Sequence, residues 1–338
     1  MSDEIPLGLR LDFYRALRRI RLLDERMQAL QRQGRIGFYG TCTGQEAVPV
    51  ALGFALVRTD WVFPALRESS VLLVRGFSLD AYLAQVFGNA LDVLKGRQMP
   101  SHMSGRAANV VSWSSCIGTQ LTHAVGAAWA AKLRRENMVS VACLGDGATS
   151  SADFHSALNF AQVFRVPCVF VCQINQWAIS TPAARQSNTR TFAEKARGYA
   201  MRAERLDGND VCALYSSFQA AVERARAGLG PSFLECVTYR IGPHSTSDDP
   251  TLYRSEQDVA EWKTKDPIAR LSRELLAEGA LDEASVRAVD LELVAEIEAA
   301  LARVEAEPPP PRASLFDDVY AKLPPHLLEQ RAALFASR

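Results

Sequence analysis

The segment from Thr119 to Gln173 has an order of elements that restricts the chain to few folds. Thr119 to Arg135 is alanine-rich with helical spacing, and Val139 to Leu144 is a short apolar run typical of a strand. Ser150 to Phe164 has helical spacing again, and Pro167 to Gln173 is a second apolar run. Two strands joined through a helix lie parallel in one sheet, and continuous apolar strands are covered on both faces. This segment therefore predicts a parallel α/β fold.

Other segments extend the sheet and add helices at both ends. Leu11 to Gln33 is a charged amphipathic helix, and Phe233 to Arg240 is a third apolar strand. Asp282 to Glu307 is a long helix that ends at the proline tract beginning at Pro308. Leu315 to Phe335 is amphipathic and suited to docking on a neighbour. We expect an N-terminal helical arm over residues 1–40, an α/β domain over 41–265, and a helical C-terminal segment over 266–338 that packs on the domain and on a partner subunit.

Composition and patterning exclude several classes of protein. Lys+Arg and Asp+Glu both number 38, so the formal net charge is zero and nothing indicates a general attraction to nucleic acid or to an anionic membrane. The N-terminus lacks the apolar core of a secretory signal, and the longest apolar run, Val166 to Cys172, is too short to span a bilayer. The seven cysteines form no Cys-x-x-Cys pair, which argues against a zinc site. We expect a cytoplasmic protein with reduced thiols.

A Gly-Asp-Gly turn follows the first strand of the central unit. Gly145 and Gly147 allow the backbone to turn sharply and to approach a ligand closely. The turn lies between the end of a strand and the start of a helix, where free backbone N–H groups bind phosphate. Asp146 would repel a phosphate there unless a cation lies between them. The turn favours a polyphosphate bridged by Mg²⁺, although Gly-Asp-Gly is also an ordinary turn sequence.

Asn175 supports the metal interpretation. It follows the next apolar strand, 29 residues after Asp146. One strand–helix–strand repeat returns the chain to the same edge of the sheet, where open α/β sheets bind ligands. The two side-chain oxygens then converge, and a backbone carbonyl beyond Asn175 can add a third ligand; the alternative is that Asn175 only stabilises a turn. The chain has no GxGxxG after a strand and no GxxxxGK[ST], so a dinucleotide site and a P-loop are unsupported.

Three basic side chains are further candidates. His244, one of five histidines, lies in an aperiodic loop beyond a strand end, where it could exchange a proton near neutral pH or simply face solvent. Arg67 and Arg240 could pair with phosphate or carboxylate, although most arginines only carry surface charge.

These motifs resemble one family from about Tyr14 to Gln330. The run that opens at Gly145 and closes at Asn175 looks like the thiamin-diphosphate motif. The segments GRQMPSHMSG, GTQLTHAVGAAWAAK, VTYRIGPHSTSDDPTLYR and DPIARL are similar to alpha subunits of branched-chain 2-oxo acid dehydrogenases. The resemblance implies a thiamin-diphosphate-binding α/β fold, a parallel sheet flanked by helices with a helical C-terminal extension.

The resemblance also implies roles position by position. Asp146 and Asn175 would bind Mg²⁺ by their side chains, and Trp177 by its backbone carbonyl. The positions that match cofactor contacts are Arg67, Ser115, Ile117, Gly145, Gly147, Ala148, Arg240 and His244. Of these, Ser115 and Ile117 match positions at the aminopyrimidine, and His244 matches the active-site histidine. A potassium site of some relatives matches Ser114, Cys116, Thr119 and Gln120, so K⁺ is a further candidate.

Three positions depart from the family pattern. Many relatives have Asn-Asn-Gly-Tyr where this chain has Ile-Asn-Gln-Trp, which ends at Trp177 and keeps the metal-binding asparagine. Relatives often have Gln-Tyr before the arginine that matches Arg67, whereas this chain has Ala65 and Leu66, which makes that wall more apolar. Pro243 stands where animal members have a second histidine.

The activity implied is oxidative decarboxylation of a branched-chain 2-oxo acid, such as 2-oxoisovalerate, with transfer of the acyl group to the lipoyl domain of an acyltransferase component. His244 would assist decarboxylation and acyl transfer. A separate beta subunit would complete the site in an α2β2 heterotetramer, so the chain alone would be inactive. Three alternatives stay open: an alpha subunit of pyruvate dehydrogenase, one of acetoin dehydrogenase, and a non-catalytic scaffolding subunit. Ser245 matches a serine modified in animal members, which raises the hypothesis of a kinase-regulated loop.

Overall fold

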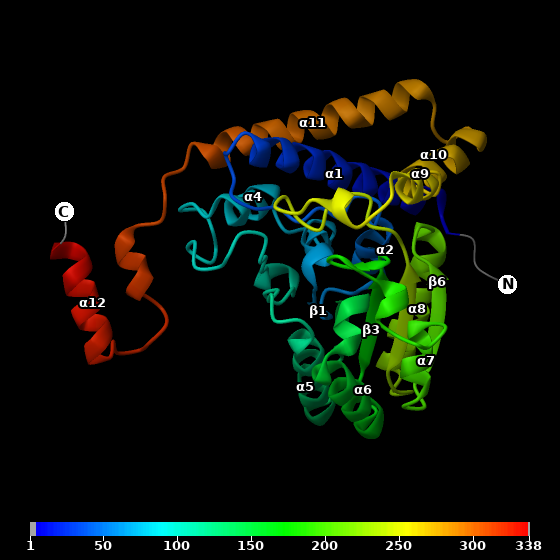
Figure 1. Ribbon diagram of the computed structural model, residues 1–338, viewed down its shortest axis with the longest axis horizontal. Coiled ribbons are helices and arrows are strands. Elements are labelled where there is room, and N and C mark those ends of the chain that lie inside the picture. Colours follow the sequence, from blue (N-terminus) through cyan, green and yellow to red (C-terminus); the bar gives the residue numbers. More distant parts are fainter. Residues whose placement is uncertain (1–4, 337–338) are drawn as a thin grey trace.

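A five-stranded parallel sheet lies at the centre of the computed structural model, which describes residues 5–336 (Figure 1). Its strands are β1 (Trp61–Phe63), β2 (Ser140–Gly145), β3 (Cys168–Ile174), β6 (Arg202–Asp207) and β7 (Ser232–Val237). The order across the sheet is β1-β2-β3-β7-β6, and every neighbouring pair is parallel. A small antiparallel pair, β4 (Trp177–Ala178) and β5 (Thr181–Pro182), follows β3. The predicted parallel α/β fold is confirmed.

Helices cover both faces of this sheet. The helices of the described chain are α1 (Leu7–Arg32), α2 (Ala47–Ala55), α3 (Val71–Val74), α4 (Leu79–Phe87), α5 (Thr119–Arg134), α6 (Ala152–Phe164), α7 (Phe192–Arg197), α8 (Val211–Arg226), α9 (Glu256–Lys263), α10 (Pro267–Ala277), α11 (Glu283–Glu305) and α12 (Pro325–Ala336). In β3, Val169 and Val171 join the core that contains α1, α2, α8 and α11, whereas Phe170 and Cys172 join the core of α5, α6 and α7. The strand alternation thus fills both layers. Within residues 5–336, no helix is long and apolar enough to cross a membrane.

Helix α11 lies along α1 on one side of the molecule (Figure 1). A set of ion pairs joins the two helices, here called the arginine ladder: Arg15–Glu292, Arg18–Asp290, Arg19–Glu296 and Arg26–Glu298. Beyond α11 the chain runs outward, and Figure 1 shows α12 standing apart from the α/β domain. None of the residues of α12 is buried.

The strands β1 and β6 are not predicted from the sequence, and the structure shows the physical reason. Both are edge strands of the sheet; β1 has only three residues, and β6 has no buried residue. An edge strand has solvent on one side and so lacks the continuous apolar run of β2 and β3.

Several predicted boundaries are also wrong, and two of them lie next to predicted site residues. After Gly145 the chain forms a 3₁₀ turn, Asp146–Ser150, and α6 begins only at Ala152, because Ser151 caps the helix by accepting a hydrogen bond from the backbone N–H of Phe154. Strand β7 ends at Val237 rather than at Arg240. The extended backbone continues beside β3, since the N–H of Arg240 donates to the carbonyl of Asn175 over 3.2 Å.

Candidate active site

The carboxyl ends of β2 and β3 lie side by side. Gly145 is in register with Gln173, so Asp146 and Asn175 follow neighbouring positions at the same edge of the sheet. Both side chains are buried, with exposed fractions of 2% and 8%. The predicted adjacency of these two strands is confirmed, and it places a carboxylate and an amide oxygen at one edge.

Asp146 has a neutral partner. Gln186 donates from its Nε2 to an Asp146 carboxylate oxygen over 2.8 Å, and no cationic side chain forms an ion pair with this carboxylate within the part of the chain that the structure describes. Burial raises the pKa of Asp146, and the hydrogen bond from Gln186 opposes that shift. A buried carboxylate without a cationic partner is suited to binding a metal ion.

The turn after Asn175 has unusual backbone geometry. The side-chain oxygen of Asn175 accepts from the N–H of Trp177 over 3.2 Å, and Gln176 and Ile179 have φ values of 73° and 57°. A left-handed conformation is costly for a β-branched residue such as Ile179, and such strain gathers at functional sites. The carbonyls of Trp177 and Ile179 accept from Arg240, over 3.4 and 2.7 Å.

The two glycines of the Gly-Asp-Gly turn differ in their surroundings. A Cβ on Gly147 would lie 2.8 Å from the Cβ of Ala178 in β4, so only glycine allows this close approach. A Cβ on Gly145 would meet nothing nearer than the Gln173 carbonyl at 3.9 Å. Gly147 is therefore required by packing, whereas the space beside Gly145 is open.

Arg240 is the largest of the fully buried side chains, with 1% exposed. Its guanidinium donates to the Tyr253 hydroxyl over 2.7 Å as well as to the Ile179 carbonyl, and its Nε is buried without a partner. Burial lowers the pKa of Arg240. All its hydrogen-bond acceptors within the described residues are neutral, so no ion pair there compensates its charge.

Arg67 provides a second buried cation. It comes from the 3₁₀ turn Leu66–Ser70 and donates to the carbonyls of Thr41 and, over 2.9 Å, His244. Burial and then the charge of Arg240 lower the pKa of Arg67 to about 10. Among residues 5–336, no carboxylate forms an ion pair with Arg67 or Arg240. Two unpaired buried guanidiniums are costly unless an anion binds between them, and phosphate oxygens suit their geometry.

His244 lies against these arginines rather than in free solvent. Burial, and then the charges of Arg67 and Arg240, lower the pKa of His244 to about 4. Its backbone N–H donates to Asp248 over 2.7 Å. The ring is therefore neutral near pH 7 and can both accept and donate a hydrogen bond. Ser245 is buried with 8% exposed, which does not favour the hypothesis that a kinase modifies it in this conformation, whereas Ser247 is exposed.

Several residues that the sequence does not mark as candidates hold the His244 loop in place. Tyr253 donates to Asp248, and Arg254 donates to the carbonyls of Ile241, over 2.8 Å, and Gly242, over 3.1 Å. Thr246 and Tyr39 exchange two hydrogen bonds of 3.2 Å. Tyr253 and Arg254 end the VTYRIGPHSTSDDPTLYR motif, so the motif contained them but gave no sign of what they contact.

Ser115 and Ile117 belong to a separate part of the site. Ile117 is 59% exposed, on the loop that leads into α5. A Cβ on Gly118 would lie 2.3 Å from the Ser151 hydroxyl, so this loop touches the end of the Asp146–Ser150 turn. No hydrogen bond joins Ser115 or Ile117 to Arg67 or Arg240 within the described residues. The structure thus has a cationic group and an apolar surface near one Gly-Asp-Gly turn.

The four positions that match a potassium site also lie on this loop and at the start of α5. Ser114 accepts from the N–H of Cys116 over 3.2 Å, and the Thr119 hydroxyl donates to the Cys116 carbonyl over 2.9 Å. Gln120 donates from its Nε2 to the Cys143 carbonyl of β2 over 2.9 Å. Their oxygens are the kind that a hard cation prefers.

Any metal here would need a mixed set of ligands. No group of three or more His, Cys, Asp and Glu side chains that could hold a metal occurs in the described chain. Asp146, the amide oxygen of Asn175 and the carbonyl of Trp177 supply oxygen ligands only. Such a set suits Mg²⁺, which is commonly bound by one or two carboxylates together with the oxygens of a phosphate.

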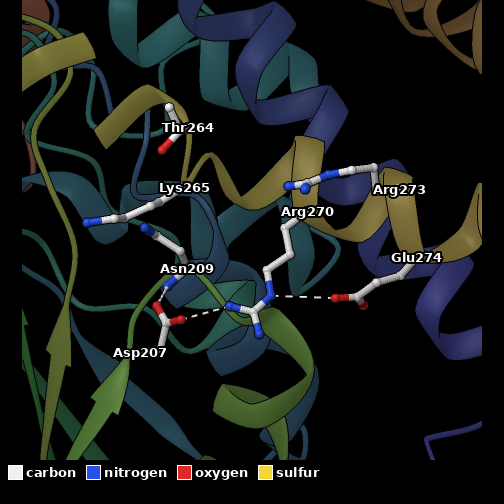
Figure 2. A pocket seen from close by; sticks show the side chains of 7 residues that line it. All are labelled: Asp207, Asn209, Thr264, Lys265, Arg270, Arg273 and Glu274. Carbon is white, nitrogen blue, oxygen red and sulfur yellow. Dashed lines mark hydrogen bonds and ion pairs between the residues drawn. The ribbon is translucent and has the colours of Figure 1, made fainter. Parts of the chain in front are cut away.

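The hollow in Figure 2 is a different place. It has a volume of about 410 Å³ and lies between the end of β6 and α10. Arg270 crosses it and pairs with Asp207, over 2.7 Å, and with Glu274, over 3.5 Å. None of the predicted site residues lines it. Because Arg270 is paired with both carboxylates that line this hollow, it does not compete with the arginine site.

Comparison with known proteins gives a consistent result. The family described as "Dehydrogenase E1 component" matches residues 14–313. The 2-oxoisovalerate dehydrogenase subunit alpha of Pseudomonas aeruginosa is 42% identical over 327 residues, which are 95% of this chain and 80% of that protein. The mitochondrial 2-oxoisovalerate dehydrogenase subunit alpha of Homo sapiens is 40% identical over 334 residues, 98% of this chain and 75% of the human protein. The mitochondrial 2-oxoisovalerate dehydrogenase subunit alpha 2 of Arabidopsis thaliana is 40% identical over 331 residues, which are 98% of this chain and 69% of the plant protein.

Proposed function

This chain belongs to the dehydrogenase E1 component family, and on that premise we propose that it is the alpha subunit of a thiamin-diphosphate-dependent branched-chain 2-oxo acid dehydrogenase. The reaction is the oxidative decarboxylation of an acid such as 2-oxoisovalerate, with transfer of the acyl group to a lipoyl group. The names of the similar proteins favour this substrate over pyruvate and acetoin, and they do not favour a scaffolding role.

The observation that carries the proposal is the buried pair Arg67 and Arg240. Neither has a carboxylate partner in the described chain, and the Nε of Arg240 has no partner at all. A diphosphate would supply the missing negative charge and acceptor oxygens. Gly147 and Ala148, in the turn between β2 and α6, would offer backbone N–H groups to the same phosphates.

Asp146, Asn175 and the Trp177 carbonyl would hold Mg²⁺ between the protein and the diphosphate. The unpaired, buried carboxylate of Asp146 fits this role, and the left-handed residues around Trp177 fit a turn shaped for a ligand. Ser114, Cys116, Thr119 and Gln120 would hold K⁺. Gly145, with open space beside it, would allow the cofactor to approach the backbone.

When bound, thiamin diphosphate supplies the carbon nucleophile and the electron sink for decarboxylation. This chain would contribute orientation and proton handling. The exposed side chain of Ile117 would support the rings, and Ser115 would border the aminopyrimidine. His244 is neutral near pH 7, so it can donate a hydrogen bond to a developing negative charge and accept a proton during acyl transfer. Its place beside Arg67 keeps it at the diphosphate end of the site.

We propose that a beta subunit completes the site in an α2β2 heterotetramer and that a lipoyl domain then docks at its mouth. The separated helix α12 fits a role in this assembly because it buries none of its own residues and exposes Leu328 and Phe335. The isolated chain would then be inactive until it binds the beta subunit.

The experiment is decarboxylation by the alpha chain co-expressed with its neighbouring beta subunit. Rates on 2-oxoisovalerate, pyruvate and acetoin are measured with and without thiamin diphosphate and Mg²⁺. We expect activity that requires both and is highest on 2-oxoisovalerate. Cofactor-dependent activity on pyruvate or acetoin alone would show that the substrate is not a branched-chain 2-oxo acid. A folded heterotetramer that is inactive on all three substrates would overturn the proposal of an enzyme. Full activity of the alpha chain alone would overturn the proposal that the beta subunit completes the active site.

A further inference from the structure

His102 is a buried histidine whose two ring nitrogens are both occupied. It is 7% exposed, in the loop before α5. Its Nδ1 lies 3.0 Å from the carbonyl oxygen of Pro100, and its Nε2 forms a very short hydrogen bond with the hydroxyl of Ser115. The ring lies against Trp113, with centroids 4.1 Å apart. His102 is thus fixed from three sides, and one of its contacts is a residue that matches a cofactor position.

The partners of His102 determine which way these hydrogen bonds run. A carbonyl oxygen can only accept, so Nδ1 must carry the proton toward Pro100. In the neutral ring Nε2 then holds a lone pair and accepts from the Ser115 hydroxyl. The chain of bonds is therefore Ser115 to His102 to the Pro100 carbonyl, with every donor matched to one acceptor.

The loop that His102 reaches has few other anchors. Ser115, Cys116 and Ile117 are all exposed, and the only side-chain hydrogen bond that ties Ser115 to another part of the described chain is the one to His102. The neighbouring bonds, from Cys116 to Ser114 and from Thr119 to Cys116, stay within the loop. Without His102, the exposed stretch that carries Ile117 would be free to take other conformations.

We propose that His102 is a positioning residue: by holding Ser115 it keeps the loop that carries Ile117 in the conformation that receives the ring system of the cofactor. This inference rests on the proposed function, since it is that function that brings a thiamin cofactor to the loop. It assigns no chemical step to His102. The diphosphate end of the site, at Arg67 and Arg240, is held by other contacts and does not depend on it.

Because His102 lies away from the diphosphate end of the site, its effect can be tested by comparing two ligands. Thiamin diphosphate has the rings and the diphosphate, whereas pyrophosphate has only the phosphates. Dissociation constants of thiamin diphosphate and of inorganic pyrophosphate, each with Mg²⁺, are measured by calorimetry on the co-expressed heterotetramer. The variants are His102→Phe, Ser115→Ala and the double variant. Phenylalanine keeps a ring against Trp113 but has no nitrogen. The matched control is His155→Phe. His155 is an exposed residue of α6 whose ring hydrogen-bonds the Tyr199 hydroxyl.

We expect each single variant to bind thiamin diphosphate with an affinity roughly tenfold lower, as the loss of one hydrogen bond predicts. The double variant should be no weaker than the singles, because the two residues act as one unit. Pyrophosphate affinity should not change, and the control should bind both ligands like the unmodified protein.

Three results would overturn the inference: unchanged thiamin diphosphate affinity in His102→Phe, additive losses in the double variant, or an equal loss for pyrophosphate. If His102→Phe does not assemble with the beta subunit, Ser115→Ala must still lower the affinity for thiamin diphosphate and leave the affinity for pyrophosphate unchanged. A failure of the proposed function looks different, since the unmodified heterotetramer would then bind no thiamin diphosphate.

Discussion

The guanidinium of Arg67 donates a hydrogen bond to the backbone carbonyl of His244 over 2.9 Å. This bond joins the 3₁₀ turn Leu66–Ser70 to the loop that follows β7, so one cation holds the candidate catalytic histidine in place. The same cation lowers the pKa of that histidine. An anion that neutralises Arg67 therefore raises the pKa of His244, which couples ligand binding to proton handling.

The first prediction concerns the charge of Arg67. Replacing it by methionine, Arg67→Met, keeps much of the volume but removes the guanidinium. We expect the affinity for pyrophosphate with Mg²⁺ to fall by roughly 10- to 100-fold, because charge-assisted hydrogen bonds to an anion are lost. Calorimetry on the heterotetramer measures this directly. Arg106→Met, at an exposed arginine, is the control and should bind normally. Equal pyrophosphate affinities of the two variants would show that Arg67 does not bind the anion.

The second prediction concerns the pKa of His244. In the ligand-free protein it is lowered to about 4 by burial and by Arg67 and Arg240, while Asp248 opposes the shift. A bound pyrophosphate offsets the two positive charges, so we expect the pKa to rise toward the ordinary value of about 6.5. Titration of ¹³C-labelled histidine by NMR, with and without pyrophosphate, measures it. His244→Gln identifies the resonance, and an unchanged pKa would show that no anion binds beside this ring.

The same shift has a consequence for stability. The unfolded chain protonates His244 near pH 6.5, whereas the folded chain does so only near pH 4. Between these values the unfolded state binds more protons, so this residue makes the free energy of unfolding fall as pH drops from about 6.5 to about 4. His244→Gln should lose part of that acid sensitivity in urea titrations, and pyrophosphate should reduce it in the unmodified protein.

The sequence predicts the part of the site that depends on the sheet and not the part that depends on loops. Asp146 and Asn175 follow apolar strands of regular spacing, so their meeting at one edge follows from the rules of parallel sheets. Arg67 reaches the site from a 3₁₀ turn, and Gln186 reaches Asp146 from an aperiodic loop. His102 meets a serine 13 positions away through another such loop. Contacts of this kind leave no period in the sequence. The residue type made Arg67 a candidate for an anion site and the resemblance supported it, whereas nothing pointed to Gln186.

The third prediction separates packing from ligand access at the Gly-Asp-Gly turn. In Gly147→Ala the added Cβ would lie 2.8 Å from Ala178, so the turn must shift. We expect a loss of about 1–3 kcal/mol in the free energy of unfolding, measured by urea titration of the ligand-free heterotetramer. Gly145→Ala meets nothing nearer than 3.9 Å and should unfold like the unmodified protein. It should nevertheless bind thiamin diphosphate more weakly, since its methyl group enters the open space beside the turn. Equal stabilities of the two variants would contradict the packing argument.

The fourth prediction concerns the arginine ladder that joins α1 to α11. Arg18 and Asp290 form two hydrogen bonds, of 2.8 and 2.7 Å, and their side chains are only 20% and 31% exposed, so this pair is better shielded than most surface pairs. Exposed ion pairs contribute about 0.2–1 kcal/mol each. We expect Arg18→Glu to lower the free energy of unfolding by about 1–2 kcal/mol, because attraction is replaced by repulsion with Asp290.

The reversed pair distinguishes this attraction from a general effect of charge. Adding Asp290→Arg to Arg18→Glu restores an ion pair, so the double variant should recover most of the lost stability at low salt. Raising NaCl to about 1 M shortens the screening length to about 3 Å and should narrow the gap between the single variant and the unmodified protein. Urea titrations at equal protein concentration measure each step, since assembly makes stability depend on concentration. If the double variant lost the sum of the two single losses at low salt, Arg18 and Asp290 would not be coupled, and the packing of α11 on α1 would depend on apolar contacts such as those of Leu301.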